Sequence, residues 1–125
     1  MVALYWKGFL IACEGIPVTV AVSLVAVLIG GVIGLFLALL RLARNPVLHN
    51  IAKIYIDVVR GTPMVVQAFI FAYGIPQLLQ SNGVQFRWSN LVIPAVIVCG
   101  LNSAAYMAEI VRSGIQAVDK GQMEA

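Results

Sequence analysis

Three long stretches of the chain contain no charged residue. Residues 15–40 and 61–86 each give 26 uncharged positions, and residues 88–108 give another 21. A helix needs about 20 residues to cross the hydrocarbon core of a bilayer, so each stretch is long enough. The pattern predicts an all-α, integral membrane helical bundle with three transmembrane helices, over approximately residues 18–40, 62–80 and 90–109.

The predicted helices differ in how strongly they favour the membrane. Val18–Leu40 contains fifteen Val, Ile, Leu or Phe residues, which gives a gross insertion free energy of about −5 to −9 kcal/mol. Leu91–Ala108 contains only seven and also carries Asn102 and Ser103, so the same scale gives about −2 to −4 kcal/mol. We therefore expect the third helix to insert against protein neighbours within a bundle.

Basic residues predict the orientation of these helices. Residues 41–60 carry four Lys or Arg and the tail after the third helix carries two, whereas the N-terminal stretch and residues 81–88 carry one each. Because Lys and Arg accumulate in cytoplasmic loops, we expect loop 41–60 and the C-terminus in the cytoplasm and the N-terminus outside. An amphipathic stretch from Val47 to Val58 predicts a helix at the cytoplasmic surface, either separate from the second transmembrane helix or continuous with it.

Composition agrees with a membrane protein and argues against other classes. The chain is 62% hydrophobic and 10% charged, whereas a soluble domain is about 45–50% apolar and 25% charged. Two cysteines and one histidine lack the number and spacing of a disulfide scaffold or a metal site. No nucleophile–base pair and no phosphate-binding glycine loop is evident. We expect no cofactor, no metal, no catalytic residue and no nucleic-acid partner, and an enzyme has the weakest support.

Two segments suggest how the helices pack and bend. Small residues recur along the first helix, with Gly30, Gly34 and Ala38 on one stripe, and such stripes let two membrane helices approach closely. Before the second helix, Arg60-Gly61-Thr62-Pro63 predicts a helix start at Pro63 with Thr62 as its N-cap. Two interpretations of this segment remain open: a kink with an interfacial arginine, or a hinge beside a translocation path.

The third helix carries the polar residues. Asn102, Tyr106 and Glu109 lie on one face at three- and four-residue spacing, and Ser103 flanks that face. Polar groups in hydrocarbon need partners, so this face is expected to take part in interhelical hydrogen bonds or to line a translocation path. Glu109 and Arg112 are three residues apart and can pair on the helix surface, although an ordinary interfacial charge is the favoured interpretation of Arg112.

Four segments give the chain a family resemblance. These segments are Gly15–Val20, Val59–Pro63, Ala104–Ile115 and Asp119–Ala125. With them the chain resembles the permease subunits of bacterial ATP-binding-cassette (ABC) importers for polar amino acids, of the glutamine, glutamate and histidine type. Their order and spacing agree with the family along the whole chain.

The resemblance implies a function and partners. It implies a multi-pass protein of the bacterial inner membrane that forms part of a translocation path. The implied partners are an ABC ATPase subunit, a homo- or heterodimeric permease partner, an extracytoplasmic substrate-binding protein and the lipid bilayer. In such permeases a cytoplasmic Glu-Ala-Ala loop docks on the ATPase, and residues 113–125, with Gly121, Glu124 and Ala125, resemble its start.

The end of the chain departs from the family pattern. Only the first two residues of Glu-Ala-Ala are present, so the chain resembles a C-terminally truncated fragment that lacks the coupling element and two final helices. As it stands, such a fragment is not expected to support ATP-driven transport. The alternative is a complete three-helix membrane protein, either an assembly factor or a channel-forming oligomer. An open reading frame that continues past Ala125 through two more hydrophobic spans would favour the permease.

Overall fold

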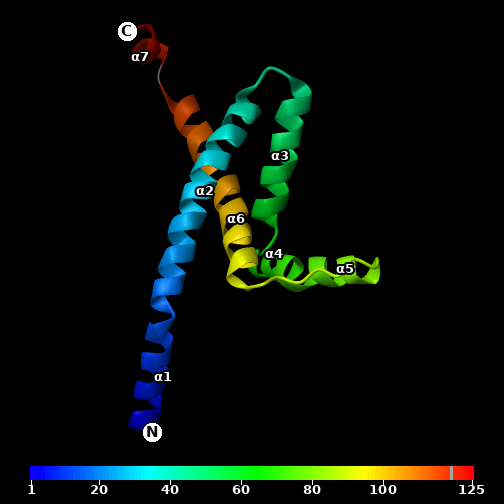
Figure 1. Cartoon of the computed structure of the whole chain (residues 1–125). Helices are drawn as coiled ribbons and strands as arrows, with labels where there is room; N and C mark the ends of the chain where they lie inside the picture. Colours follow the sequence, from blue (N-terminus) through cyan, green and yellow to red (C-terminus); the bar gives the residue numbers. More distant parts are fainter. Residues whose placement is uncertain (119) are drawn as a thin grey trace.

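The computed structural model describes residues 1–118 and 120–125, and these residues form helices joined by short connections, without a strand (Figure 1). The helices follow one another as α1 (Val2–Glu14), α2 (Ile16–Leu42), α3 (Pro46–Gly61), α4 (Met64–Phe69), η1 (Ile70–Gly74), α5 (Ile75–Ser81), α6 (Val92–Ala117) and α7 (Lys120–Glu124). This confirms the all-helical class predicted from the sequence.

The first two helices form one long rod (Figure 1). Only Gly15 separates α1 from α2, and its backbone is itself helical, with φ −77° and ψ −14°. Pro17 lies in the first turn of α2, where a missing N–H is tolerated. The apolar rod extends from Val2 to Leu42, 41 residues in all, and is about 60 Å long at 1.5 Å per residue. A bilayer core of about 30 Å therefore accommodates only part of it.

The closest packing in the molecule is between α2 and α6. Ala26, Gly30, Gly34 and Ala38 form a buried stripe along α2. A Cβ atom built on Gly30 would lie 2.5 Å from the Cβ of Ser103 on α6. Two glycines thus allow backbone-to-backbone approach, which favours association of helices in lipid because van der Waals contact drives it.

Helix α3 turns back and lies alongside α2 and α6 (Figure 1). Its start is defined by Asn45, whose side-chain oxygen accepts a hydrogen bond from the N–H of Val47 at 2.9 Å. Ala52 and Ile56 are buried, and the Tyr55 hydroxyl donates to the carbonyl oxygen of Leu101 on α6 at 2.8 Å. The stretch expected as a surface helix within a loop is therefore packed against α2 and α6, through Ala52, Ile56 and Tyr55. Its larger apolar side chains stay exposed on the other side of the helix: Val47, Leu48, Ile51, Ile54 and Val58.

A sharp bend separates α3 from the following helices, at 101°. Thr62 does not cap the next helix as predicted. Its hydroxyl instead donates backwards to the Val58 carbonyl oxygen at 2.8 Å, and α4 begins at Met64. The Gln67 amide donates to the carbonyl oxygens of Val59 and Thr62, at 2.9 and 3.0 Å. These side chains satisfy two of the open C-terminal carbonyls of α3, those of Val58 and Val59.

The single helix expected over residues 62–80 is instead α4, the π-helical η1 and α5 in succession. The cause is Pro76, which has no N–H to donate to the preceding turn. The Ile75 N–H donates to the Ile70 carbonyl oxygen. The Phe71 carbonyl oxygen therefore receives a backbone hydrogen bond from neither Ile75 nor Pro76. The Trp88 indole N–H donates to that oxygen at 2.8 Å, which ties the loop before α6 to the π segment.

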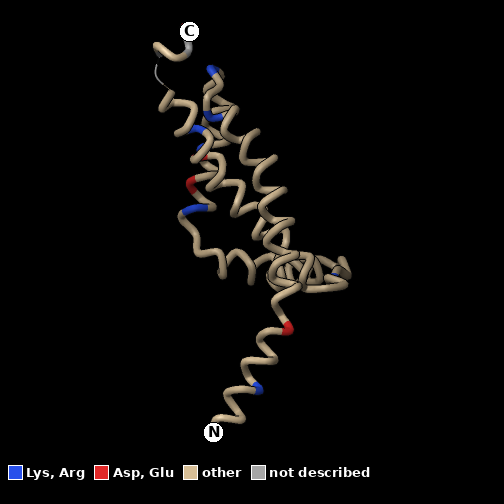
Figure 2. Tube along the Cα trace, turned by 90° about the vertical axis from the view of Figure 1, so that its left-hand side faces the viewer, with Lys and Arg blue, Asp and Glu red and all other residues tan. Residues whose placement is uncertain are grey.

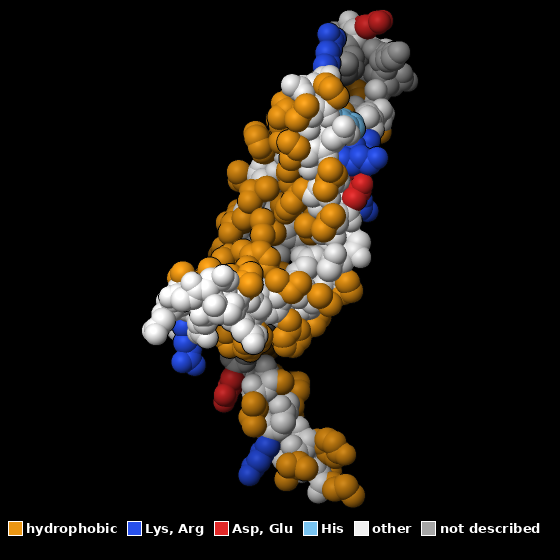
Figure 3. Space-filling model, turned by 90° about the vertical axis from the view of Figure 1, so that its right-hand side faces the viewer, with side chains coloured by type: hydrophobic (Ala, Val, Ile, Leu, Met, Phe, Trp, Pro, Cys, Tyr) orange, Lys and Arg blue, Asp and Glu red, His pale blue; other side chains and the backbone are white. Residues whose placement is uncertain are grey.

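Two helices of the described residues, the α1–α2 rod and α6, are long and apolar enough to cross a membrane. The bent unit of α3 with α4–α5 makes a third if it counts as one span. Figure 3 shows the hydrophobic side chains that cover most of one side of the bundle. Helix α6 continues to Ala117, beyond the end predicted near residue 109, so Glu109 and Arg112 lie within the helix.

Candidate functional site

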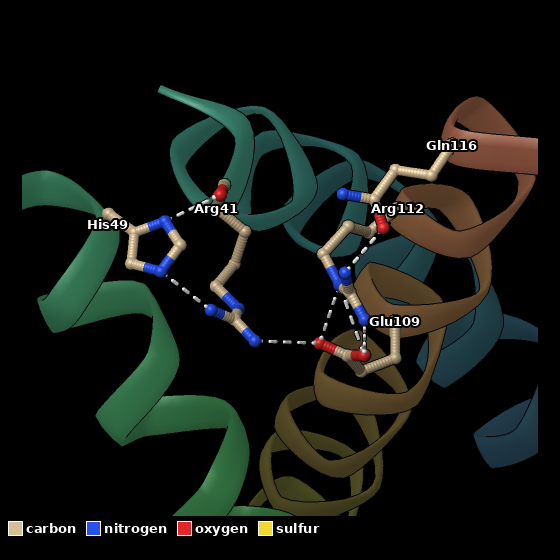
Figure 4. Close-up of polar contacts among 5 residues, drawn as sticks. All are labelled: Arg41, His49, Glu109, Arg112 and Gln116. Carbon is tan, nitrogen blue, oxygen red and sulfur yellow. Dashed lines mark hydrogen bonds and ion pairs between the residues drawn. The ribbon is translucent and has the colours of Figure 1, made fainter. Parts of the chain in front are cut away.

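Charged residues gather toward one end of the bundle, where α2 ends and α3 begins (Figure 2). Five residues there form one network, which we call the charge cluster: Arg41, His49, Glu109, Arg112 and Gln116 (Figure 4). They come from the end of α2, the start of α3 and the C-terminal half of α6. The cluster therefore joins three helices by polar contacts.

Arg41 and His49 join the end of α2 to α3. The guanidinium donates to Nε2 of His49 at 2.9 Å, and Nδ1 of the same ring lies 2.7 Å from the Arg41 carbonyl oxygen (Figure 4). Because a carbonyl oxygen only accepts, the proton of the neutral ring is on Nδ1, and Nε2 is free to accept from the arginine. Both contacts close the turn between the two helices.

Glu109 is the carboxylate at the centre of the cluster. Arg112, for which the sequence favoured an ordinary interfacial charge, pairs with it at 2.8 Å, and Arg41 approaches it at 3.6 Å from α2. The side chains of Arg41 and Glu109 are only 14% and 17% exposed. Arg112 also donates to the Gln116 side chain at 2.6 Å. One carboxylate thus offsets two largely buried guanidinium groups, and charge-assisted hydrogen bonds of this kind are among the stronger ones in proteins.

The polar face of α6 points away from the tight α2 contact. Ala104 and Ala108 are fully buried, whereas Tyr106 is 46% exposed on the other side of the helix. Ser103 faces α2, where it lies against Gly30. Asn102 is half-buried and takes part in none of the side-chain hydrogen bonds among the described residues. Its amide is therefore available to a partner helix or to a polar path.

The segment predicted as a hinge contributes one residue to this face. The guanidinium carbon of Arg60 lies 5.2 Å from the centre of the Tyr106 ring, within the range of a cation–π contact. Gly61, Thr62 and Pro63 form the bend itself and lie apart from the charge cluster. Arg60 and Tyr106 thus connect the bend to the polar side of α6.

The residues expected to begin the ATPase-coupling loop lie at the far end of the chain. Gly121 and Glu124 belong to the short helix α7, and Ala125 follows it. Asp119, with which the quoted family segment begins, lies outside the described residues. In the sequence, α7 begins three residues after the end of α6 at Ala117, and Figure 1 shows it at the C-terminal end of the chain.

Three residues contribute contacts that no pattern in the sequence predicts. They are Arg41, His49 and Gln67. Each is placed by a contact between helices or across the bend. The one available signal was the concentration of ionisable residues beside an apolar helix, which points to function when such residues lie in a membrane.

Comparison with known proteins identifies the family. Residues 30–125 match the family described as the binding-protein-dependent transport system inner membrane component. The chain belongs to this family. Its members are transport permease subunits of the inner membrane and not enzymes, so the match supports the permease interpretation over the small three-helix alternative.

Individual relatives in this permease family are named as amino-acid permeases. The chain is 44% identical over 110 residues to the L-cystine transport system permease protein of Bacillus subtilis, covering 88% of this chain and 46% of that protein. It is 40% identical over 121 residues to the putative glutamine transport system permease protein of Rickettsia prowazekii, covering 97% and 53%. The chain thus spans about half the length of these curated relatives.

A solved structure shows the same arrangement of helices. The crystal structure of an amino acid ABC transporter with histidines matches with a TM-score of 0.70 and 35% identity, over 93% of this chain and 54% of that one. Over 93% of the chain, the fold is thus that of a part of this transporter structure.

Proposed function

We propose that residues 1–125 supply the first membrane helices of the permease subunit in an ATP-driven amino-acid importer. The observation that carries the proposal is the family match over residues 30–125. Relatives whose names specify cystine, arginine or glutamine transport support an amino acid as the cargo. Geometry adds that α6 keeps a polar face outside its tight contact with α2.

In this proposal the N-terminus lies outside and the C-terminus in the cytoplasm. The turn from Ala43 to Asn45 and α7 then lie on the inner side, together with the charge cluster. The loop after α5 lies on the outer side, at the end of the bundle where α6 begins (Figure 1). The distribution of Lys and Arg supports this orientation.

The polar residues of α6 form part of the translocation path. The side chains of Asn102 and Tyr106 lie outside the packing contact with α2. A polar group inside a membrane carries a high energetic cost unless it has a polar partner. A permease partner, either a second copy or a sister subunit, completes the path. An extracytoplasmic binding protein delivers the amino acid to the outer side.

The ATPase subunit acts at the cytoplasmic end. The charge cluster holds the ends of α2 and α6 together directly before α7. Gly121, Glu124 and Ala125 begin the segment that docks on the ATPase. A movement of that segment is transmitted along α6, because the cluster and the small-residue contact join α6 to α2 as one body.

Co-purification and transport test this function. The complete product of the gene is tagged, purified from its own bacterium and placed in liposomes with the proteins that accompany it. We expect an ABC ATPase in the complex. We also expect uptake of a radiolabelled polar amino acid only when ATP is supplied on the side of the liposome membrane that carries the ATPase. ADP in place of ATP is the control. A purified product that retains no ATPase and takes up none of the polar amino acids would contradict the proposal.

A further inference from the structure

Arg60 presents a guanidinium group with no anionic partner on the polar side of α6. It stacks on the Tyr106 ring at 5.2 Å, and among the described residues it takes part in no side-chain hydrogen bond or ion pair. Stacking on an aromatic ring leaves the edge of the guanidinium plane, which carries its five N–H donors, open to a ligand. The contact thus holds the group in place without using its hydrogen bonds.

The nearby carboxylate does not neutralise Arg60. Both oxygens of Glu109 accept hydrogen bonds from Arg112, at 2.8 to 3.2 Å. Oε1 is also the atom that Arg41 approaches. Two other arginines therefore already use this carboxylate, and the surroundings of Arg60 carry an excess of positive charge.

Arg60 and Tyr106 line an open hollow of about 440 Å³, together with Glu109, Ile110 and Ser113. Arginine binds carboxylates through two parallel N–H···O bonds, which gives both strength and direction. We propose that this hollow binds the α-carboxylate of the transported amino acid, with Arg60 as its anchor. The inference rests on the proposed function and names the group by which this part of the path recognises its cargo.

Within the hollow, the guanidinium of Arg60 is the group that recognises the ligand. Glu109 also lines the hollow, but its carboxylate is already shared by Arg112 and Arg41. The faces of Ile110 and Ser113 that complete it distinguish no particular side chain. This site therefore recognises the backbone of the amino acid, and selection among side chains takes place elsewhere.

Binding measurements on the complete gene product in nanodiscs test the inference. The twenty common L-amino acids and L-cystine are screened, and the tightest ligand is compared with its α-amide, which lacks the negative charge. We expect wild type to prefer the acid by about tenfold to hundredfold, the range of a hydrogen bond to a charged group. Arg60→Gln should weaken the acid by that factor and remove the preference. Arg60→Lys keeps the charge but not the two-bond geometry and should lie between.

Arg44→Gln is the matched control, because Arg44 is exposed near the end of α2 and does not line the hollow. It should retain the preference for the acid. Amino-acid binding with equal affinity for acid and amide in wild type, or an unchanged preference in a folded Arg60→Gln protein, would overturn the inference and leave the proposed function intact. Failure of every amino acid to bind wild type would overturn both.

Discussion

Gly34→Val is expected to cause a large loss of stability. A Cβ atom at Gly34 would lie 2.6 Å from the Cβ of Met107 and 2.9 Å from the backbone oxygen of Ala104. Neither a backbone atom nor a Cβ atom can move aside without shifting α6. Overpacking of this kind costs about 1–3 kcal/mol, and in this molecule it acts on the closest helix contact. The measurement is the thermal midpoint of the purified chain in detergent.

Gly31→Val is the control for that substitution. The position lies on the same helix, and a Cβ atom there would meet nothing within 4 Å. Both variants exchange glycine for the same β-branched residue, so their helix-propensity terms are alike. We expect the Gly31 variant to melt close to wild type. Equal loss in the two variants would show that the contact between α2 and α6 is not what Gly34 serves.

Glu109→Gln is expected to destabilise the chain by about 2–4 kcal/mol, since it leaves two largely buried guanidinium groups without a carboxylate. The substitution keeps the shape of the side chain, so the loss reports the charge. The Nε atom of Arg41 already lies buried without a partner among the described residues, which leaves that arginine dependent on its remaining contacts. Chemical unfolding monitored by circular dichroism measures the effect.

Two further variants identify the source of this loss. Asp57→Asn also removes a carboxylate, but Asp57 is exposed and forms no ion pair with the described residues, so a change within about 0.5 kcal/mol is expected. The double variant Arg41→Gln/Glu109→Gln should be more stable than the sum of the single losses predicts, because it removes both charges of one contact. Strict additivity would exclude a coupling between α2 and α6 through this pair.

Local patterns in the sequence indicated the features that depend on helix periodicity. The stripe with Gly30 and Gly34 marks one face of α2, and the structure places that face against α6. The three-residue spacing of Glu109 and Arg112 allows the pairing that the structure shows. Both features lie within a single helix, where the 3.6-residue repeat determines which side chains share a face.

Features that depend on contacts between helices could not be predicted from the sequence. Nothing in the spacing of Arg41 and Glu109 reveals that they meet across α2 and α6. The bend after α3 was located correctly at Thr62 and Pro63, but its angle depends on Gln67 reaching back to the preceding helix. Similarly, the π segment arises because Pro76 lacks an N–H and Trp88 supplies a donor from a separate loop.

The most direct test of the whole account is the sidedness of two exposed positions. Single cysteines are introduced at Arg44, in the turn between α2 and α3, and at Asn82, at the end of α5, after Cys13 and Cys99 have been replaced by serine. Cells and inverted vesicles are then treated with a thiol reagent that does not cross membranes. The account predicts labelling of Asn82→Cys only in intact cells and of Arg44→Cys only in inverted vesicles. Labelling of both positions from the same side would contradict it.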